Sequence, residues 1–294
     1  MLKKAMRLSY SVGNVSDEAL RTYSENGIHT IELSLGHMKA FPYAGFENLK
    51  ARAEQYDVET YSFHLPFCPF NEVSIATQEQ NLRKFSVEFL SELIKKVAHE
   101  GFSVAVIHPS HEPISDETRA ENIKCAKDSL SKLADVCEQS GMVLAVEDLP
   151  RTCLGNTISE MKELIADDDR LRVCFDTNHL LKDRATNFIY DLKDKIVTLH
   201  VSDYDFKNER HWMPYEGKLD WVKLVTALEE IGYSGPFTYE LGLKPAATIN
   251  RRVMTYADIR ANYQALMEKR PAEVLSTPNV KVCEEKDYYK EPQI

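Results

Sequence analysis

The chain has 294 residues, of which 43% are hydrophobic and 28% are charged, a composition typical of an ordinary globular protein. The formal net charge is −10, from 36 Lys and Arg against 46 Asp and Glu, so nucleic acid is not favoured as a general partner. No segment approaches the roughly 20 apolar residues of a membrane span, and no apolar signal region follows the first lysines. We therefore expect a cytoplasmic protein that does not bind membranes.

Eight short segments rich in Val, Ile, Leu and Phe recur along the chain and predict β-strands. In chain order they are residues 6–12, 29–35, 58–65, 103–109, 142–149, 171–177, 196–203 and 235–241. Several of them are apolar at both alternating positions, which is typical of parallel strands that are covered on both faces.

Amphipathic segments between these strands predict helices. Residues 78–100 carry apolar side chains close to a 3.6-residue period, and Gly101 follows as a C-terminal stop. Residues 115–141 begin with a capping Ser or Asp and end at Gly141. Asp220 precedes a further helical segment as its cap.

The alternation of strands and helices predicts an α/β protein with a single (β/α)8 TIM barrel over residues 1–269, because such barrels typically have about 250 residues. A doubly wound open sheet is the alternative, but SYSVGN is a poor match to the glycine-rich loop it would need. Residues 270–294 fit no ninth unit. They are expected to form a C-terminal extension that wraps the barrel, contacts a second copy in a homo-oligomer or is partly disordered.

Polar residues end most of the predicted strands, and the C-terminal ends of barrel strands converge on one mouth, where active sites lie. The second strand carries Glu32, and His179 follows the sixth. The third to eighth strands end in His64, His108, Glu147, Asp176, His200 and Glu240. His and carboxylate side chains in such a ring suit a divalent ion such as Zn²⁺ or Mn²⁺, and a metal site is therefore predicted.

Each of these residues also has a structural interpretation. A lone His at a strand end is more often a hydrogen-bonded polar terminus, and an Asp after a strand often caps a helix. In the segment FDTNHLL, Asp176 is either such a cap or is directed with His179 at a ligand. Glu147 and Glu240 are harder to explain in this way, because each interrupts an apolar strand where a buried carboxylate needs a partner.

The loop after the seventh strand reads SDYDFKNERHWMPYEGKLDW and contains further candidates. His211 lies in it, two residues after Glu209. Trp212 and Tyr215 either close over a small ligand or pack the loop itself.

Several of these segments together resemble the xylose-isomerase-like TIM-barrel superfamily, which includes sugar phosphate isomerases/epimerases and is related to endonuclease IV. They are VEDL, CFDTNH, LHVSD, the ERH…EG-x-x-DW loop and TYEL, within about residues 6–245. The resemblance implies that a divalent metal is held by Glu147, Asp176, His200 and Glu240. It also implies that Glu147 and Glu240 act as an acid/base pair, and that His179 lies beside the substrate and the metal.

The chain departs from two patterns within this superfamily. His64, His108 and His211 match the multi-metal endonuclease, but Glu209 replaces its aspartate two residues before the last histidine. These residues and His179 are therefore candidates for a second metal or for substrate binding. Cys153 stands where ketose 3-epimerases have a second glutamate six residues after Glu147.

The leading hypothesis is a metal-dependent isomerase or epimerase of a small carbohydrate, free or phosphorylated, which transfers a proton through a metal-stabilised enediolate. An abasic-site endonuclease with several zinc ions is one alternative. The acidic charge argues against it, as does the loop after the second strand, where Lys39 is the one basic residue. A dehydratase of a sugar- or inositol-derived ketone and a non-catalytic sugar-binding barrel are the others.

Overall fold

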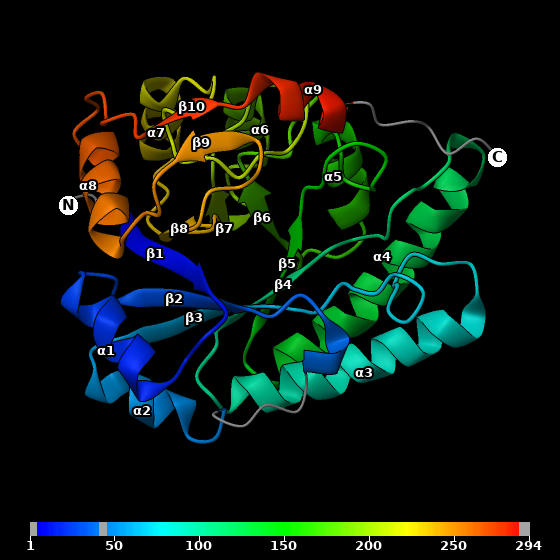
Figure 1. Ribbon diagram of the computed structural model, residues 1–294. Coiled ribbons are helices and arrows are strands. Elements are labelled where there is room, and N and C mark those ends of the chain that lie inside the picture. The colour runs from blue at the N-terminus through cyan, green and yellow to red at the C-terminus, as the bar shows by residue number, and fades with distance from the viewer. Residues whose placement is uncertain (1–4, 41–45, 288–294) are drawn as a thin grey trace.

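The computed structural model describes residues 5–40 and 46–287, and eight parallel strands in it form a closed barrel (Figure 1). The strands follow one another in chain order, and the last pairs with the first. They are β1 (Arg7–Val12), β2 (Thr30–Ser34), β3 (Glu59–His64), β4 (Val104–Ile107), β5 (Val143–Glu147), β6 (Arg172–Asp176), β7 (Ile196–Val201) and β8 (Pro236–Tyr239). The predicted (β/α)8 barrel is confirmed, and each predicted strand segment contains one of these strands.

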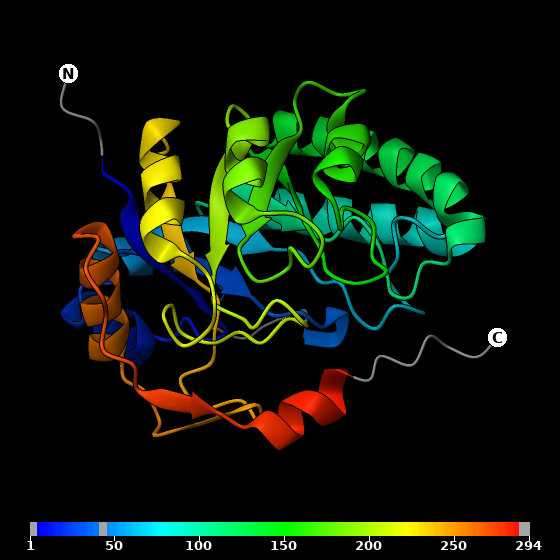
Figure 2. The same cartoon turned by 90° about the horizontal axis from the view of Figure 1, so that it is seen from above.

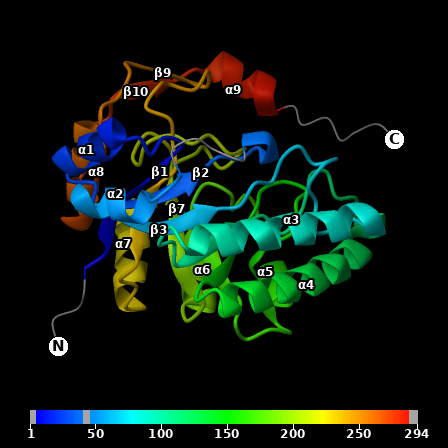
Figure 3. The same ribbon diagram turned by 90° about the horizontal axis from the view of Figure 1, so that it is seen from below.

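Helices surround the barrel. They are α1 (Asp17–Glu25), α2 (Leu49–Gln55), α3 (Gln80–Ala98), α4 (Asp116–Gln139), α5 (Ile158–Ile165), α6 (Ala185–Leu192), α7 (Trp221–Glu230) and α8 (Tyr256–Met267), with a short 3₁₀ turn, η1 (Met38–Ala40). The long helices α3 and α4 lie side by side (Figures 1 and 3). They correspond to predicted residues 78–100 and 115–141, and Asp220 caps α7 as expected by accepting a hydrogen bond from Lys223 N–H. Within the described residues, no helix is long and apolar enough to cross a membrane.

Alternation along the strands separates two sets of side chains. One set, exemplified by Ile31, Val146 and Phe175, packs with the helices in the main hydrophobic core. The other set faces the barrel interior, where adjacent strands place equivalent positions at one level. On the β4–β6 side this interior is a small apolar cluster of Val104, Val106, Ala145 and Cys174.

The rest of the barrel interior is polar, although barrel interiors are usually filled by bulky branched side chains. Its buried polar residues are Ser9, Thr30, Glu32, Ser62, Thr198 and Thr238, from β1, β2, β3, β7 and β8. Continued to the strand ends, the same inward set supplies the predicted His, Glu and Asp residues. Strand alternation is therefore the reason why these residues converge.

The C-terminal part of the chain forms elements that the sequence does not predict. Strand β9 (Ile249–Arg251) pairs antiparallel with β10 (Ser276–Pro278), and α9 (Val280–Asp287) follows. Figures 2 and 3 show these elements at one edge of the molecule. Ile249 of β9 and Cys283 of α9 pack on Trp212, so these two elements cover part of the loop between β7 and α7. The remainder of the predicted extension, residues 288–294, lies outside the described residues.

Candidate functional site

Asp203 organises the loop of residues 203–219 that leads from β7 to α7. Its carboxylate accepts four hydrogen bonds of 2.7–3.1 Å, from the backbone N–H groups of Tyr204, Tyr215 and Leu219 and from Trp221 Nε1. Gly217 passes so close to Asp203 that a Cβ there would overlap the carboxylate. The loop that carries Glu209 and His211 is thus held in one conformation by buried contacts.

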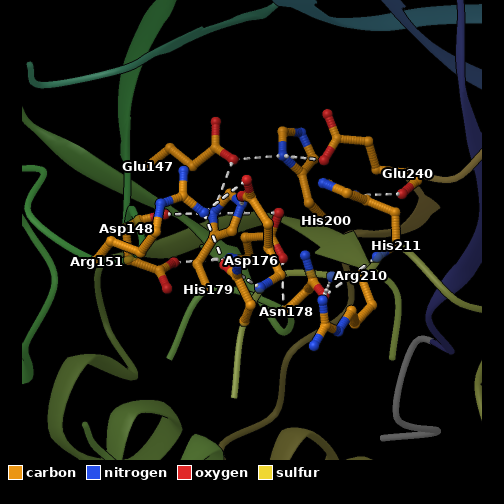
Figure 4. Close-up of polar contacts among 12 residues, drawn as sticks. Glu147, Asp148, Arg151, Asp176, Asn178, His179, His200, Arg210, His211 and Glu240 are labelled. Atoms are coloured by element: carbon orange, nitrogen blue, oxygen red, sulfur yellow. Dashed lines mark hydrogen bonds and ion pairs between the residues drawn. The ribbon is translucent and has the colours of Figure 1, made fainter. Parts of the chain in front are cut away.

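The four residues predicted as metal ligands come together at the mouth of the barrel (Figure 4). One ligand atom from each of Glu147, Asp176, His200 and Glu240 lies within 4.8 Å of the others. His200 Nδ1 is 3.0 Å from Glu147 Oε1 and 3.5 Å from Glu240 Oε2. The Glu240 side chain is 23% exposed, whereas the Glu147 and His200 side chains are buried. Glu240 is therefore the member of this four-residue cluster that solvent reaches.

Asp176 does not cap a helix, because α6 begins only at Ala185. Its Oδ1 accepts a hydrogen bond of 2.7 Å from Asn178 N–H, which stabilises the turn after β6. Its Oδ2 is buried, receives no hydrogen bond from the described residues and lies 3.4 Å from His179 Nδ1. That nitrogen donates instead to the Asp148 carbonyl at 2.8 Å. One carboxylate oxygen of Asp176 is therefore directed into the cluster without a hydrogen-bond donor.

Glu147 also contacts three histidines that are outside the four-residue cluster, and one of them, His179, has its Nδ1 3.6 Å from Glu147 Oε1. His64 Nε2 lies 3.0 Å from Glu147 Oε2 at hydrogen-bonding geometry, and His108 Nε2 lies 3.3 Å from the same oxygen. The Phe67 ring stacks on His108, with ring centroids 4.1 Å apart. His64, Glu147 and His200 thus form a second group with ligand atoms within 4.8 Å of one another.

The remaining candidates, His179, Glu209 and His211, form a third group of this kind. His179 Nε2 is 3.2 Å from Glu209 Oε2. His211 Nδ1 donates to the backbone carbonyl of Glu240 at 3.2 Å, which links this loop to the end of β8. The nine residues predicted as metal ligands, acid/base groups or substrate contacts therefore all belong to one of the three groups or, for His108, contact one. Glu32, from the same ring of strand residues, lies 2.9 Å from His200 Nε2.

Sequence reasoning misses Arg151 and Glu112, which hold this third group from outside. Arg151 Nε and Nη2 donate to the Glu112 carboxylate at 2.7–3.2 Å, and its Nη1 is 2.7 Å from Glu209 Oε1. Glu209 is therefore held between Arg151 and His179 (Figure 4 shows both of these residues). Nothing in the sequence pattern indicates this, because the three charged residues come from three different loops. Cys153, at the position of the missing glutamate, is buried, and burial raises the pKa of its thiol.

The carboxylates of the four-residue cluster have pKa values shifted in opposite directions. Burial alone would raise the pKa of Glu147, but His200 and His108 hold it well below its usual range. Burial raises the pKa of Asp176 well above its usual value against the opposing effect of His179, and the nearby Glu240 and Glu147 raise it further. The cluster therefore favours either a bound proton on Asp176 or an added cation.

Known proteins share the fold of this chain and part of its sequence. The family model of the xylose isomerase-like TIM barrel matches residues 20–257. An uncharacterised protein of Methanocaldococcus jannaschii is 25% identical over 196 residues, which cover 64% of this chain and 66% of that protein. A fructoselysine 3-epimerase of Shigella flexneri is 23% identical over 241 residues, or 76% of this chain and 84% of that enzyme.

Solved structures include a D-tagatose 3-epimerase-like protein that is 20% identical in sequence. It superposes with a TM-score of 0.75 and covers 96% of this chain and 99% of that one. A structural match at 20% sequence identity shows a shared fold and no more. The family of this chain is given by the match to the family model. The chain belongs to the xylose isomerase-like TIM barrel family.

Proposed function

We propose that this protein is a divalent-metal-dependent isomerase or epimerase of a small hydroxy-carbonyl sugar, free or phosphorylated. The observation that carries the proposal is the cluster of Glu147, Asp176, His200 and Glu240, with ligand atoms within 4.8 Å of one another at the barrel mouth. The fructoselysine 3-epimerase among the relatives in sequence supports the substrate class.

The ligand set of this cluster fits a divalent cation. Three carboxylates in one cluster repel one another, and Asp176 Oδ2 receives no hydrogen bond from the described residues. Oxygen and imidazole ligands in this number suit Zn²⁺ or Mn²⁺. In this proposal Glu147, Asp176, His200 and Glu240 hold the ion. When bound, it supplies Lewis-acid polarisation of the substrate carbonyl.

The two glutamates act as the acid/base pair. One carboxylate takes the proton from the carbon beside the carbonyl, and the electron pair of the broken C–H bond moves towards the carbonyl oxygen. The other glutamate returns a proton to the opposite face of the same carbon, which gives the epimer. Neighbouring histidines lower the pKa of Glu147 and keep it ionised, so it is unprotonated when substrate arrives, although the lowered pKa makes it a weaker base. Glu240 is 23% exposed, so it can exchange protons with solvent between turnovers.

The histidines around the cluster bind and orient the substrate in this proposal. His179 lies next to Asp176 and is held from its other side by Glu209. His108 is 16% exposed and is held against Phe67. Both nitrogens of His179 already have partners, so a sugar hydroxyl would be oriented by this ring only if it replaced Glu209 at Nε2.

The test is a panel of ketoses and ketose phosphates incubated with the Mn²⁺-loaded protein and followed by NMR. We expect an equilibrium between two epimers or isomers, whereas loss of water would indicate a dehydratase. Glu147→Gln and Glu240→Gln should each reduce kcat by about 10²–10⁴-fold, the usual contribution of a general acid or base. Glu54→Gln, on the exposed surface of α2, is the control and should be fully active. Full activity in either of the two site variants would contradict the assignment.

An abasic-site endonuclease is the second candidate, because the two further groups around His64 and His179 offer ligands for additional ions. The ion pair between Arg151 and Glu209 argues against it, since a guanidinium already compensates that carboxylate. The two functions are separated by incubating Zn²⁺-loaded protein with a duplex that contains one abasic site. The sugar-enzyme proposal predicts an intact strand.

A further inference from the structure

Glu32 is a fully buried carboxylate in the polar part of the barrel interior. It lies on β2 in register with Ser11 of β1 and Ser62 of β3, so the three residues occupy one level. Ser62 Oγ donates to Glu32 Oε2 at 2.8 Å, and Ser11 Oγ donates to Oε1 at 3.1 Å. Two hydroxyl groups therefore fix the orientation of this carboxylate.

The same carboxylate faces His200 from below the four-residue cluster. Glu32 Oε1 is 2.9 Å from His200 Nε2, whereas His200 Nδ1 donates a hydrogen bond to Glu147 Oε1 at 3.0 Å. Within the described part of the chain, Nε2 has no hydrogen-bond partner with suitable geometry. The carboxylate that lies within ion-pair distance of it is Glu32. The thiol of Cys174, on β6, is another neighbour of the His200 ring.

A carboxylate buried this deeply calls for a functional explanation, because a protein with an apolar residue of similar volume at such a position is often equally or more stable. Histidines that bind metals usually donate their second ring N–H to a carboxylate, which fixes the tautomer and the direction of the ring. The arrangement of Glu32, His200 and the cluster follows that pattern, with one ring nitrogen directed to each side.

We propose that Glu32 is a positioning residue of this site. With a metal bound, its carboxylate would hold the His200 ring with Nε2–H towards the barrel interior. Nδ1 would then exchange its hydrogen bond to Glu147 for a lone pair directed between Glu147, Asp176 and Glu240. Ser11 and Ser62 hold Glu32 in turn. The inference rests on the proposed metal-dependent function, but it assigns Glu32 no contact with the substrate.

The experiment measures the affinity of the metal-free protein for Mn²⁺ alone, from the electron paramagnetic resonance signal of the free ion and without any sugar. Glu32→Gln removes the charge with little change in volume and should weaken binding by about 10–100-fold. Ser62→Ala removes one hydrogen bond to Glu32 and should have a smaller effect in the same direction. Ser9→Ala is the control, because the Ser9 hydroxyl is buried in the same barrel without a hydrogen bond to the described residues. It should bind as the wild type does.

The outcomes distinguish the inference from the function on which it rests. If the wild type does not bind Mn²⁺, the proposed function fails, and the role of Glu32 fails with it. If the wild type binds and Glu32→Gln binds equally well, the role of Glu32 alone is wrong. Circular dichroism establishes that each variant is folded. If Glu32→Gln does not fold, Ser62→Ala decides, and unchanged affinity there overturns the inference. Loss of affinity in Cys174→Ala but not in Glu32→Gln would also overturn it, because the thiol would then position the ring.

Discussion

The ion pair between Glu216 and Arg251 connects β9 to the loop that carries Glu209 and His211. Arg251 Nη1 donates to Glu216 Oε2 at 2.7 Å, and both side chains are 1% exposed. Arg251 Nη2 also donates to the Gly242 carbonyl at 3.0 Å. The Arg251→Met substitution keeps much of the buried volume but removes both hydrogen bonds and leaves the Glu216 carboxylate buried without its counterion.

Breaking a buried ion pair from one side costs about 3–5 kcal/mol, because the remaining charge is desolvated without compensation. For a chain of 294 residues, an unfolding entropy of about 2.1 cal/mol/K per residue converts this loss into a fall in Tm of about 5–8 °C. Arg252→Met is a matched control. Arg252 pairs with Asp258 at 2.7 Å, but its side chain is 54% exposed, and exposed pairs contribute at most about 1 kcal/mol.

The assay is urea unfolding of Arg251→Met, Glu216→Gln, the double variant and Arg252→Met, treated as a double-mutant cycle. The double variant should be more stable than Arg251→Met alone, because it contains no isolated buried charge. A loss below about 1 kcal/mol in Arg251→Met, or a double variant as unstable as Arg251→Met, would refute the reasoning.

Three further predictions concern the site and its supporting loop. Gly217→Ala forces a Cβ against the Asp203 carboxylate and should lower the free energy of unfolding by more than about 2 kcal/mol, measured in urea, whereas Gly13→Ala has space and should be tolerated. Burial raises the pKa of Asp148 to about 8, so the folded metal-free protein keeps a proton there that the unfolded chain releases above its usual pKa. This proton makes the wild type less stable as the pH rises from about 4 to about 8, and Asp148→Asn should remove that decrease in the free energy of unfolding. If the free energy of unfolding changes with pH in the same way in both proteins, Asp148 is not the cause. Adding Mn²⁺ at 100 times its Kd should stabilise the metal-free protein by about 2.7 kcal/mol, seen as a higher Tm, and no shift in Tm would exclude specific binding to the folded state.

The barrel was predictable because its strands repeat a strong local pattern. Apolar segments such as MVLAVEDL and LRVCFDT have the length and composition of covered parallel strands, and the structure contains a strand in each. The convergence of Glu147 and Asp176 then follows from the geometry of any such barrel, which directs strand ends to one mouth.

Other parts of the site were not predictable because they depend on contacts between distant loops. Arg151 and Glu112 meet across two loops, and no spacing in the sequence indicates their ion pair. Glu32 was visible on its strand, but its role depends on which nitrogen of His200 faces it. The pairing of β9 with β10 spans residues 249–278 and lacks the repeated strand–helix pattern that indicates the barrel.

The central claim, proton transfer by Glu147 and Glu240 at the carbon beside a sugar carbonyl, is tested most directly by running the reaction in D₂O. The account predicts that each product molecule acquires deuterium, at that carbon in an epimer or at the adjacent carbon in an isomer, detected by NMR and mass spectrometry. Glu147→Gln and Glu240→Gln should nearly abolish this incorporation while retaining the metal. Product that forms without deuterium, or undiminished incorporation in both variants, would contradict it.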